Sequence, residues 1–457
     1  MRDSWRLAML VGAVAAVPFA VALGAPFVLD DETDIVGSFP PDVSPLTRLG
    51  HLGRPFLKIT YALGLWAHGP SPPGFRLVNV ALHAIAAVLV FLLAARWLSA
   101  RKLAAAGAAA FASAIVWALH PLAAETVTYV SGRSMGLSTA LLLGAMVLVA
   151  RDEQPSTTRA IGAGVLAVLA PLAKETALVL PLLLAWWEAT LGPRDVSWRE
   201  RVRRNAPVWA GALLALLVMF ALPRHRELVG FSLAVRPPLE ALRGNVQAVP
   251  AMLGLWAFPW RISIDPGAPL EWGWTEGPTL LRLGFLGALA LLALAARRRV
   301  PWAAFAGGWM LLAIAPSNSF VWRLDPVGVR PLYLASVGPA VLVGFLVSAA
   351  ASRAPAAGRL ALASALVLAC ALGAGLVMRN ALHRSSIALW EDAVHKAPRN
   401  ARAKSNLGFA YLAAGRLDDA EAALEAARDG GPVTRQAECG LLAIRIRRQT
   451  MALEEMK

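Results

Sequence analysis

Cysteine and charge are both scarce in this sequence. Only two cysteines occur among 457 residues, Cys370 within an apolar run and Cys439 near the C-terminus. Because their settings differ and their spacing matches no set of metal ligands, we expect neither a disulfide framework nor a zinc site. Charged residues make up only 16% of the chain, which is low for a soluble protein. These shortages exclude a small disulfide-stabilised domain and an ordinary soluble enzyme.

Hydrophobic runs are abundant instead. Hydrophobic residues make up 57% of the chain and the mean hydropathy is +0.56. The net charge of +15 could indicate nucleic-acid binding. However, the basic residues form short clusters between apolar runs and make no single stripe with interleaved aromatics, so positive-inside topology explains them better. We therefore predict an all-α polytopic membrane protein surrounded by membrane lipids, with no nucleic-acid partner.

About eleven segments are apolar and long enough to cross a bilayer. They lie near residues 7–29, 76–96, 103–120, 134–150, two within 160–190, 207–223, 279–296, 302–317, 331–350 and 360–378. The first follows Arg2 and Arg6 and could pass for a signal peptide, but its length favours a membrane crossing. Basic residues between the segments predict a cytoplasmic N-terminus.

The stretch 160–190 needs a separate interpretation. One helix of this length would reach roughly 46 Å, well beyond the hydrocarbon core. It also contains Pro171 and Pro181, with Lys174 and Glu175 between them. We predict two short helices that turn near Lys174 at the outer surface, because this keeps the basic segment 194–204 inside.

A second unusual segment, 224–276, is long and carries four tryptophans. These are Trp256, Trp260, Trp272 and Trp274. Tryptophan is enriched where membrane meets water, so we predict helices lying in the outer interface and no further crossing.

The composition changes after residue 380 to charged, alanine-rich helix. We predict a membrane domain over residues 1–380 and a separate tail over 381–457. The tail has the spacing of one 34-residue tetratricopeptide repeat, at Asn406, Leu407, Gly408, Tyr411, Gly415, Ala420, Leu424, Ala427 and Pro432. An odd number of crossings puts this tail outside. Because about three repeats are needed for independent stability, we expect it to pack on the membrane domain or on a protein partner.

Several polar residues share the predicted outer side with the acidic pair Asp30 and Asp31. They are Arg54, His120, Glu125, Arg133, Lys174, Glu175, Arg330 and Tyr333. A carboxylate that deprotonates an acceptor and cations that stabilise a leaving phosphate are the groups that transfer from a lipid-phosphate sugar requires. Each residue also has a structural explanation: the aspartates could end a helix, and the arginines could contact lipid headgroups. His83, one turn after Asn79, is expected to form an interhelical hydrogen bond.

The order of these motifs resembles the multi-spanning GT-C glycosyltransferases, in particular bacterial relatives of the transmembrane and tetratricopeptide-repeat-containing O-mannosyltransferases. The likeness rests on Asp30-Asp31, Arg54-Pro55-Phe56, Phe75 to Asn79 with His83, His120 to Val127, Gly132-Arg133, Lys174-Glu175 and Arg330 to Gly338. It covers most of the chain, including the repeat.

The resemblance implies an enzyme of the bacterial inner membrane that transfers a sugar from a polyprenyl-phosphate donor, with inversion, to a periplasmic protein or glycan. Asp30 would be the general base and Asp31 its neighbour that orients the acceptor. Arg54, Arg133, Lys174 and Arg330 would contact the donor phosphate. His120, Glu125, Glu175 and Tyr333 would complete the pocket. No metal ligands are assigned, and the residues leave open whether a divalent metal takes part.

Two other functions are consistent with the sequence. A transporter or flippase would place intramembrane charges along a path, but the polar residues gather at one face and no internal repeat is visible. A catalytically silent scaffold would bind partners through the repeat tail, and the membrane part would serve as its anchor.

Overall fold

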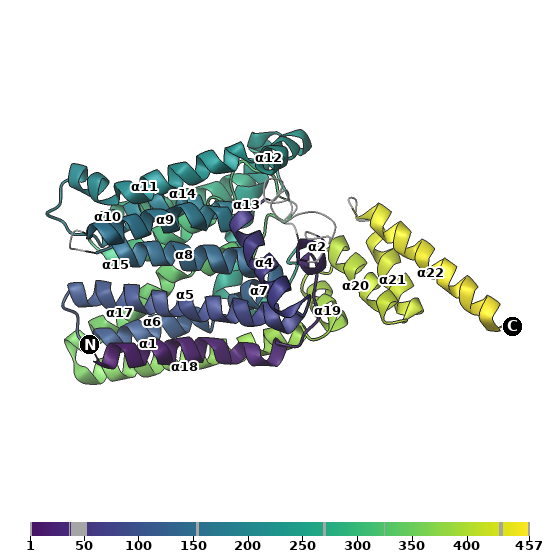
Figure 1. Ribbon diagram of the computed structural model, residues 1–457, viewed down its shortest axis with the longest axis horizontal. Helices are drawn as coiled ribbons and strands as arrows, with labels where there is room; N and C mark the ends of the chain where they lie inside the picture. The colour runs from purple at the N-terminus through teal and green to yellow at the C-terminus, as the bar shows by residue number, and fades with distance from the viewer. Residues whose placement is uncertain are drawn as a thin grey trace.

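The protein is a helical bundle with a smaller helical tail at one end (Figure 1). The computed structural model describes residues 2–35, 37, 53–151, 155–267, 271–323, 325–428 and 433–455. All regular structure in these ranges is helical. The N-terminus lies at the opposite end of the bundle from the tail, and we refer to the two ends as the amino end and the tail end.

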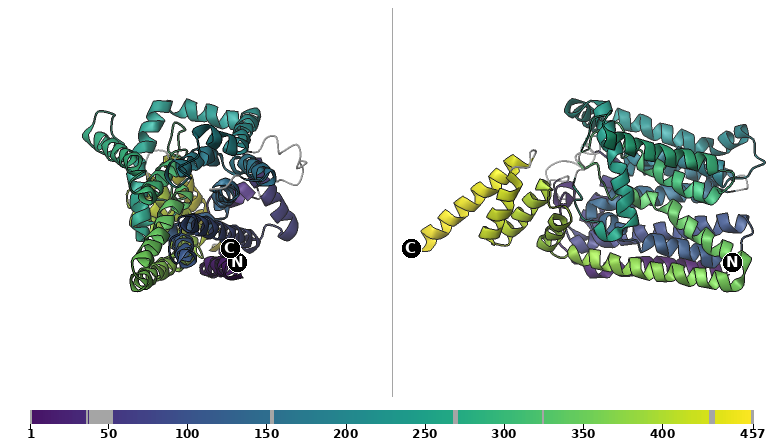
Figure 2. Two further views of the ribbon diagram at one scale, coloured as in Figure 1. Left: turned by 90° about the vertical axis from the view of Figure 1, so that its left-hand side faces the viewer. Right: turned by 180° about the vertical axis from the view of Figure 1, so that it is seen from behind.

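The bundle consists of helices that run roughly parallel to one axis (Figures 1 and 2). They are α1 (Arg2–Ala16), α5 (Pro72–Ala100), α6 (Ala106–Ala118), α8 (Arg133–Val149), α9 (Thr157–Ala173), α10 (Leu180–Thr190), α11 (Trp198–Ala221), α14 (Gly277–Ala296), α15 (Pro301–Ile314), α17 (Val337–Arg353) and α18 (Pro355–Leu382). Shorter elements connect them, including η1 (Val17–Ala22), α2 (Asp31–Ile35), α4 (Pro55–His68), η2 (Pro121–Ala123), α7 (Ala124–Val127), η3 (Val130–Gly132), η4 (Glu175–Val179), α12 (Pro223–Val235), α13 (Pro238–Ala257), η5 (Pro259–Arg261) and α16 (Pro331–Ala335). The tail comprises α19 (Ser386–Lys396), α20 (Ala401–Ala413), α21 (Leu417–Arg428) and α22 (Thr434–Glu455).

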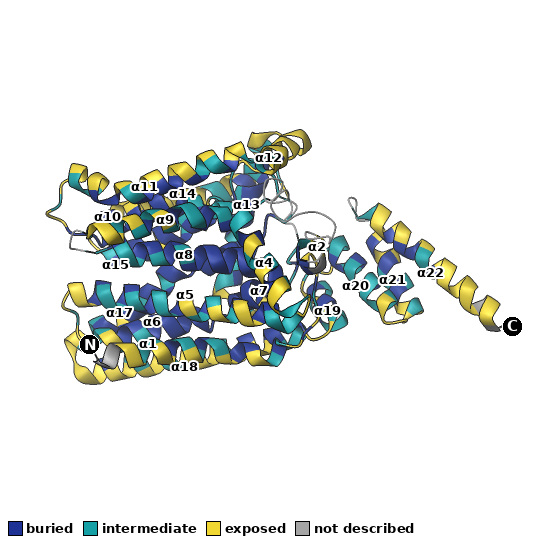
Figure 3. Ribbon diagram, viewed as in Figure 1, coloured by how far each residue is buried: buried dark blue, intermediate teal, exposed yellow. Residues whose placement is uncertain are grey.

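The bundle has the surface of a membrane protein. Seven of the described helices are long and apolar enough to cross a bilayer, and an eighth is counted if α6 and the bent segment after it form one span. Large apolar side chains are exposed along them, as on α14, where Leu281 is 76% and Leu291 67% exposed. Figure 3 shows exposed residues along α11 and α18. Such a surface suits lipid and not water. Helices α9 and α15 are shorter apolar helices, and the number eleven stays a prediction.

The first apolar run is α-helical only in its first part. Residues 7–29 were expected to form one crossing, but α1 ends at Ala16 and continues as the 3-10 helix η1 to Ala22. Pro18 lies in this 3-10 segment, where its ring and missing N–H disfavour continued α-helix. The chain is then free to form the loop that carries Asp30.

The connections between helices gather at the two ends as predicted. Arg101 donates hydrogen bonds to the carbonyls of Leu191 and Gly192, and Arg204 donates to the carbonyl of Arg151. These contacts bring together the turns after α5, α8 and α10 at the amino end. The chain reverses between α9 and α10 at Lys174, which confirms the helical hairpin predicted for residues 160–190. Which end faces the cytoplasm remains a prediction.

The segment after α11 stays at the tail end of the bundle (Figure 1). Neither α12 nor α13 belongs to the helices that are apolar and long enough to cross a membrane. Trp260 is 70% exposed, whereas Trp256 packs against the core of the bundle. The absence of a further crossing within α12 and α13 agrees with the prediction, and the location of this segment in the outer interface stays a prediction.

The tail packs on the membrane domain. Asp265 accepts two hydrogen bonds from Arg402 of α20, at 2.6 and 2.8 Å, and its side chain is only 4% exposed. Leu389 of α19 joins Val28 and Tyr129 in a small apolar cluster. The first tail helix therefore touches the loop that carries the acidic pair. Pro432, the last position of the repeat pattern, lies outside the described residues.

Candidate functional site

Asp30 and Asp31 are adjacent in the chain but lie in opposite environments. Just before them Leu29 adopts a φ of 50°, in the left-handed region. This conformation costs a non-glycine residue roughly 1–2 kcal/mol, so the loop must be held by other contacts. Arg76 supplies them, because its guanidinium donates to the carbonyls of Leu23, Ala25 and Pro26.

Asp31 is fully buried and bonds to backbone. Its carboxylate accepts from the N–H groups of Ser131 at 2.7 Å and Val28 at 3.1 Å, with a longer contact of 3.4 Å to the N–H of Val130. Burial raises the pKa of Asp31 to about 6, although the hydrogen bonds oppose this shift. Asp31 thus ties the first loop to η3 and has no open side toward solvent.

Asp30 is exposed, as a group that meets a substrate must be. Its Oδ2 accepts a hydrogen bond of 3.1 Å from the hydroxyl of Tyr129. The guanidinium of Arg330 lies over the ring of Tyr129, 5.3 Å from its centroid, at a cation–π distance. Tyr129 therefore connects the exposed carboxylate to a cation that was assigned to the phosphate.

Further basic side chains gather near Arg330. Arg54 forms a two-pronged ion pair with Glu175, at 2.6 and 2.8 Å, and both side chains are partly exposed. Lys174 lies next to this pair, half-buried, with its Nζ 3.4 Å from the hydroxyl of Ser134.

The end of the loop after α15 supplies further charges to the same cluster. Asp325 lies 3.7 Å from Arg323 and 3.8 Å from Arg330. We call Arg54, Lys174, Arg323 and Arg330 the cation cluster. Among the described residues, the carboxylates that form ion pairs with these side chains are those of Glu175 and Asp325.

Burial and the neighbouring charges both affect ionisation in the cluster. Burial is the main reason that the pKa of Lys174 lies well below its usual range, and the charges of Arg54 and Arg330 lower it further. Arg54, with Lys174 adding to its effect, lowers the pKa of Glu175 against the opposing effect of burial. An anion bound between these cations would relieve their repulsion, which is the electrostatic property expected of a phosphate site.

Arg133 does not take part in this cluster. It is fully buried, and its guanidinium donates to the side chain of Asn79 at 2.7 Å and to the carbonyl of Phe75 at 2.9 Å. The rings of Tyr61 and Phe75 flank it at 4.8 and 5.2 Å. Asn79 in turn donates to the carbonyls of Val127 and Val130. This geometry favours a role in holding the loops at the tail end.

The residues expected in the pocket wall serve mainly as connections. His120 accepts from the N–H of Leu122 through Nδ1 and donates to the carbonyl of Trp256 through Nε2, both at 3.2 Å. Tyr333 donates to His83 at 2.7 Å, which confirms the interhelical hydrogen bond expected for that histidine.

Glu125 connects the membrane domain to the tail. It is buried and accepts two hydrogen bonds from Arg379, at 2.8 and 3.0 Å. Arg379 in turn donates to Asp392 of α19 at 2.6 Å. Glu125 was expected in the same pocket wall as Glu175. It lies at the junction with the tail, whereas Glu175 pairs with Arg54 of the cation cluster.

Tyr129, Arg323 and Asp325 were missed by the sequence reasoning. Tyr129 is one of only four tyrosines in the chain and lies between two motifs that were recognised, so its position was a usable signal. Arg323 and Asp325 precede the recognised Arg330 but follow no spacing that would have pointed to them. Among the described residues, no three His, Cys, Asp or Glu side chains are grouped as metal ligands.

Comparison with known proteins agrees with the sequence motifs. Residues 383–438 match the family model of the tetratricopeptide repeat. The Drosophila melanogaster protein O-mannosyl-transferases Tmtc1 and Tmtc2 are 34% and 30% identical over 199 and 227 residues, or 39% and 44% of this chain. The chain resembles O-mannosyltransferases of the Tmtc type. The Caenorhabditis elegans protein O-mannosyl-transferase F38B6.6 is 25% identical over 189 residues, or 37% of this chain. The matched parts cover 22%, 24% and 26% of these three relatives, so the chain matches about a quarter of their length.

Proposed function

We propose that the protein is a membrane glycosyltransferase. It transfers mannose from a polyprenyl-phosphate donor to a hydroxyl group of a protein acceptor. One observation carries the proposal. An exposed carboxylate, Asp30, lies at the same end of the bundle as the cation cluster and is connected to Arg330 of that cluster through Tyr129. The names of the similar proteins support mannosyl transfer.

The reaction would be a single displacement with inversion. Asp30 accepts the proton of the acceptor hydroxyl, and the oxygen of that hydroxyl forms a bond to the anomeric carbon of the sugar. The bond from that carbon to the phosphate oxygen breaks, and the electron pair leaves with polyprenyl phosphate. Lys174, Arg54, Arg323 and Arg330 stabilise the negative charge on the departing phosphate.

The other assigned residues have supporting roles in this proposal. Asp31 and Arg133 hold the loops that position Asp30 and Tyr129, and Glu175 orients Arg54. The tail lies at the same end of the bundle, in contact with the loop of Asp30 through Leu389. It is therefore suited to present a protein acceptor to the site. If the enzyme belongs to a bacterial inner membrane, this end faces the periplasm.

The experiment is sugar transfer by the purified full chain in nanodiscs. Radiolabelled polyprenyl-phosphate mannose, glucose and galactose are offered in turn with a periplasmic protein extract. We expect label to enter protein from the mannose donor and transfer to require the lipid phosphate. If no donor in the panel is transferred or hydrolysed, the proposed enzyme is wrong and a scaffold that binds partners through its tail explains the chain better.

A further inference from the structure

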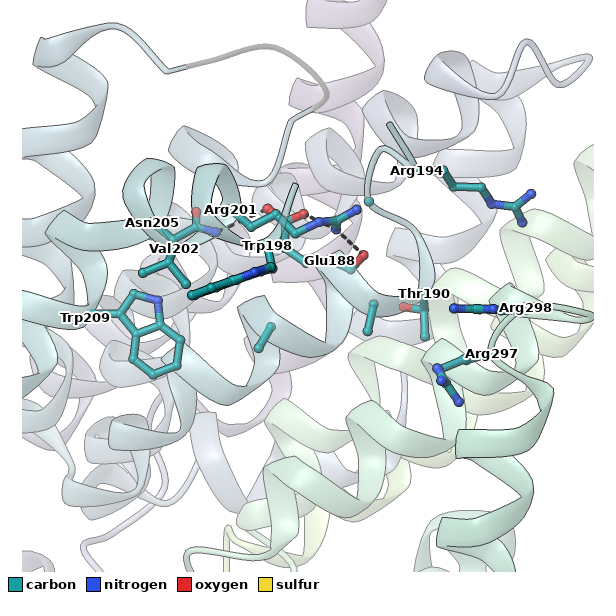
Figure 4. Close-up of a pocket in the computed structure, with 13 residues that line it drawn as sticks. Glu188, Thr190, Arg194, Trp198, Arg201, Val202, Asn205, Trp209, Arg297 and Arg298 are labelled. Carbon is teal, nitrogen blue, oxygen red and sulfur yellow. Dashed lines mark hydrogen bonds and ion pairs between the residues drawn. The ribbon is translucent and has the colours of Figure 1, made fainter. Parts of the chain in front are cut away.

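A cavity with several charged residues in its wall lies at the amino end of the bundle, far from Asp30. It has a volume of about 670 Å³ and opens between α10, the start of α11 and the turn from α14 to α15 (Figure 4). The turns that carry Arg101 and Arg151 lie at this same end of the bundle. Nothing in the proposed transfer reaction uses this cavity.

Four arginines line the cavity, against one acidic residue. Arg201 is neutralised by Glu188, whose Oε2 lies 2.7 Å from its Nη1, and Arg297 donates to the carbonyl of Leu294. Arg194 and Arg298 are exposed and form no hydrogen bond or ion pair within the described part of the chain. The wall therefore offers guanidinium groups that are free to bind an anion, and guanidinium pairs well with phosphate.

A buried acceptor also lines the cavity. Asn205 is 4% exposed, and its Nδ2 donates to Glu188 at 3.2 Å. Its Oδ1 has no hydrogen-bond partner among the described residues. A buried polar atom without a partner is costly, so a hydroxyl group from a ligand would satisfy it. Phosphate beside hydroxyl is the chemistry of a glycerophosphate headgroup.

Apart from Thr190, the remaining wall is formed by apolar residues and glycine, and it continues onto the outside of the bundle. Val202 and Trp209 of α11 line the cavity. Trp209 begins an outward-facing stripe with Leu213 and Leu217, which are 41%, 57% and 60% exposed. The spacing of four residues keeps this stripe on one face of the helix, along the direction in which acyl chains run in a bilayer.

We propose that this cavity binds the headgroup of an anionic glycerophospholipid, with the phosphate between Arg194 and Arg298 and the acyl chains along α11. Basic pockets between membrane helices are suited to such headgroups, and exposed tryptophans such as Trp198 and Trp209 belong at the level of the headgroups. The continuous apolar stripe favours a lipid over a soluble phosphate. This site is independent of the glycosyltransferase proposal.

Native mass spectrometry of the full chain in detergent tests the site, with phosphatidylglycerol, phosphatidylcholine and free glycerol phosphate as probes. We expect phosphatidylglycerol to be retained in preference to both others. The double variant Arg194→Ala/Arg298→Ala should lower the affinity for phosphatidylglycerol about tenfold or more, since each arginine near an anionic lipid contributes appreciably.

The matched control is Arg199→Ala/Arg299→Ala. These exposed arginines lie close in sequence to the tested pair but do not line the cavity, so retention should stay unchanged. Equal retention by the two double variants would overturn the site. Equal binding of phosphatidylcholine would overturn charge recognition, and equal binding of glycerol phosphate would identify a soluble ligand in place of the lipid.

A photoreactive phosphatidylglycerol gives a second readout that needs no variant. Its cross-links on the wild-type chain should map to residues 198–217 of α11. Cross-links confined to other helices would contradict the proposed seat of the acyl chains.

Discussion

The hydroxyl of Tyr129 donates a hydrogen bond of 3.1 Å to the carboxylate of Asp30, although 99 positions separate the two residues in the chain. Tyr129 is buried and packs with Val28 and the tail residue Leu389 in one apolar cluster. This relationship gives the exposed aspartate a fixed neighbour. It also makes the orientation of Asp30 depend on the junction between the membrane domain and the tail.

Replacement of the proposed base tests the chemistry directly. Asp30→Asn keeps the size of the side chain and can still accept from Tyr129, but it cannot take a proton. We expect transfer to fall by about 10²- to 10⁴-fold, the usual contribution of general base catalysis. The apparent Tm should be unchanged because Asp30 is exposed.

Asp195→Asn is the matched control, as an exposed aspartate on the turn before α11 at the amino end. It should transfer sugar at the wild-type rate. Retained transfer in Asp30→Asn would remove Asp30 from the role of base.

Loss of positive charge from the cation cluster should weaken use of the donor. Lys174→Ala and Arg330→Ala each remove one of the four basic side chains of the cation cluster. We expect kcat/KM for the polyprenyl-phosphate donor to fall by about tenfold to 10³-fold, since such groups act on charge that develops in the transition state.

Arg226→Ala is the control for these variants. Arg226 is exposed on α12 at the same end of the bundle, outside the cation cluster. If it reduces kcat/KM as much as Lys174→Ala does, the effect reflects general surface charge and not a phosphate site.

The stability of the protein should depend on pH through Asp31. Burial raises its pKa from 3.8 to about 6 in the folded state. Between pH 3.8 and about pH 6, Asp31 therefore binds a proton in the folded chain but not in the unfolded chain. The contribution of Asp31 to stability is therefore present below about pH 4 and is lost as pH rises through about 6. A shift of this size corresponds to about 2 to 3 kcal/mol.

The measurement compares the apparent Tm of wild type and Asp31→Asn from pH 4 to pH 7. The wild type should gain stability relative to the variant as pH falls, because only the wild type binds the proton. A Tm difference that is constant across this range would contradict the burial of an ionisable group at position 31.

The junction of tail and membrane domain should open when Arg402 is removed. Arg402→Ala leaves the buried carboxylate of Asp265 without its partner, which costs about 3 kcal/mol in comparable buried pairs. We expect faster amide hydrogen exchange in residues 258–267 and in α19 and α20. Helices α21 and α22 have a small core of their own and should keep their protection.

The control for the junction is Arg416→Ala, which breaks an exposed pair with Asp419 within the tail. Exposed pairs contribute little, so exchange at the junction should not change. Equal protection in Arg402→Ala and wild type would show that the other junction contacts, among them Leu389 and the Glu125–Arg379–Asp392 connection, hold the tail without this ion pair.

Much of the fold could be predicted from local pattern. The lengths of the apolar runs gave most of the bundle helices, and the prolines and charges between 160 and 190 gave the hairpin at Lys174. These features depend on the hydrophobicity of neighbouring residues, which a sequence states directly. The 3-10 segment before Ala22 was missed because apolar length does not show where a proline changes the helix type.

The site was predictable only as a set of residues. The order of motifs singled out Asp30, Arg54, Lys174 and Arg330 and placed them at one end of the bundle. Their partners were not predictable, because Glu175 pairs with Arg54 from 121 positions away and not with the adjacent Lys174. Arg133 appeared equivalent to the other cations in sequence, yet it is enclosed by Tyr61 and Phe75.

The sequence by itself determined that this is an all-helical membrane protein with a repeat tail and a concentration of charged groups at one end. Only the tertiary structure decided which aspartate of the pair is exposed. Asp31 is buried because the backbone N–H groups of Ser131 and Val28 converge on it, and Asp30 is left to Tyr129 and solvent. Burial is a property of what packs around a side chain, and Ser131, which contacts Asp31, is 100 positions away in the chain.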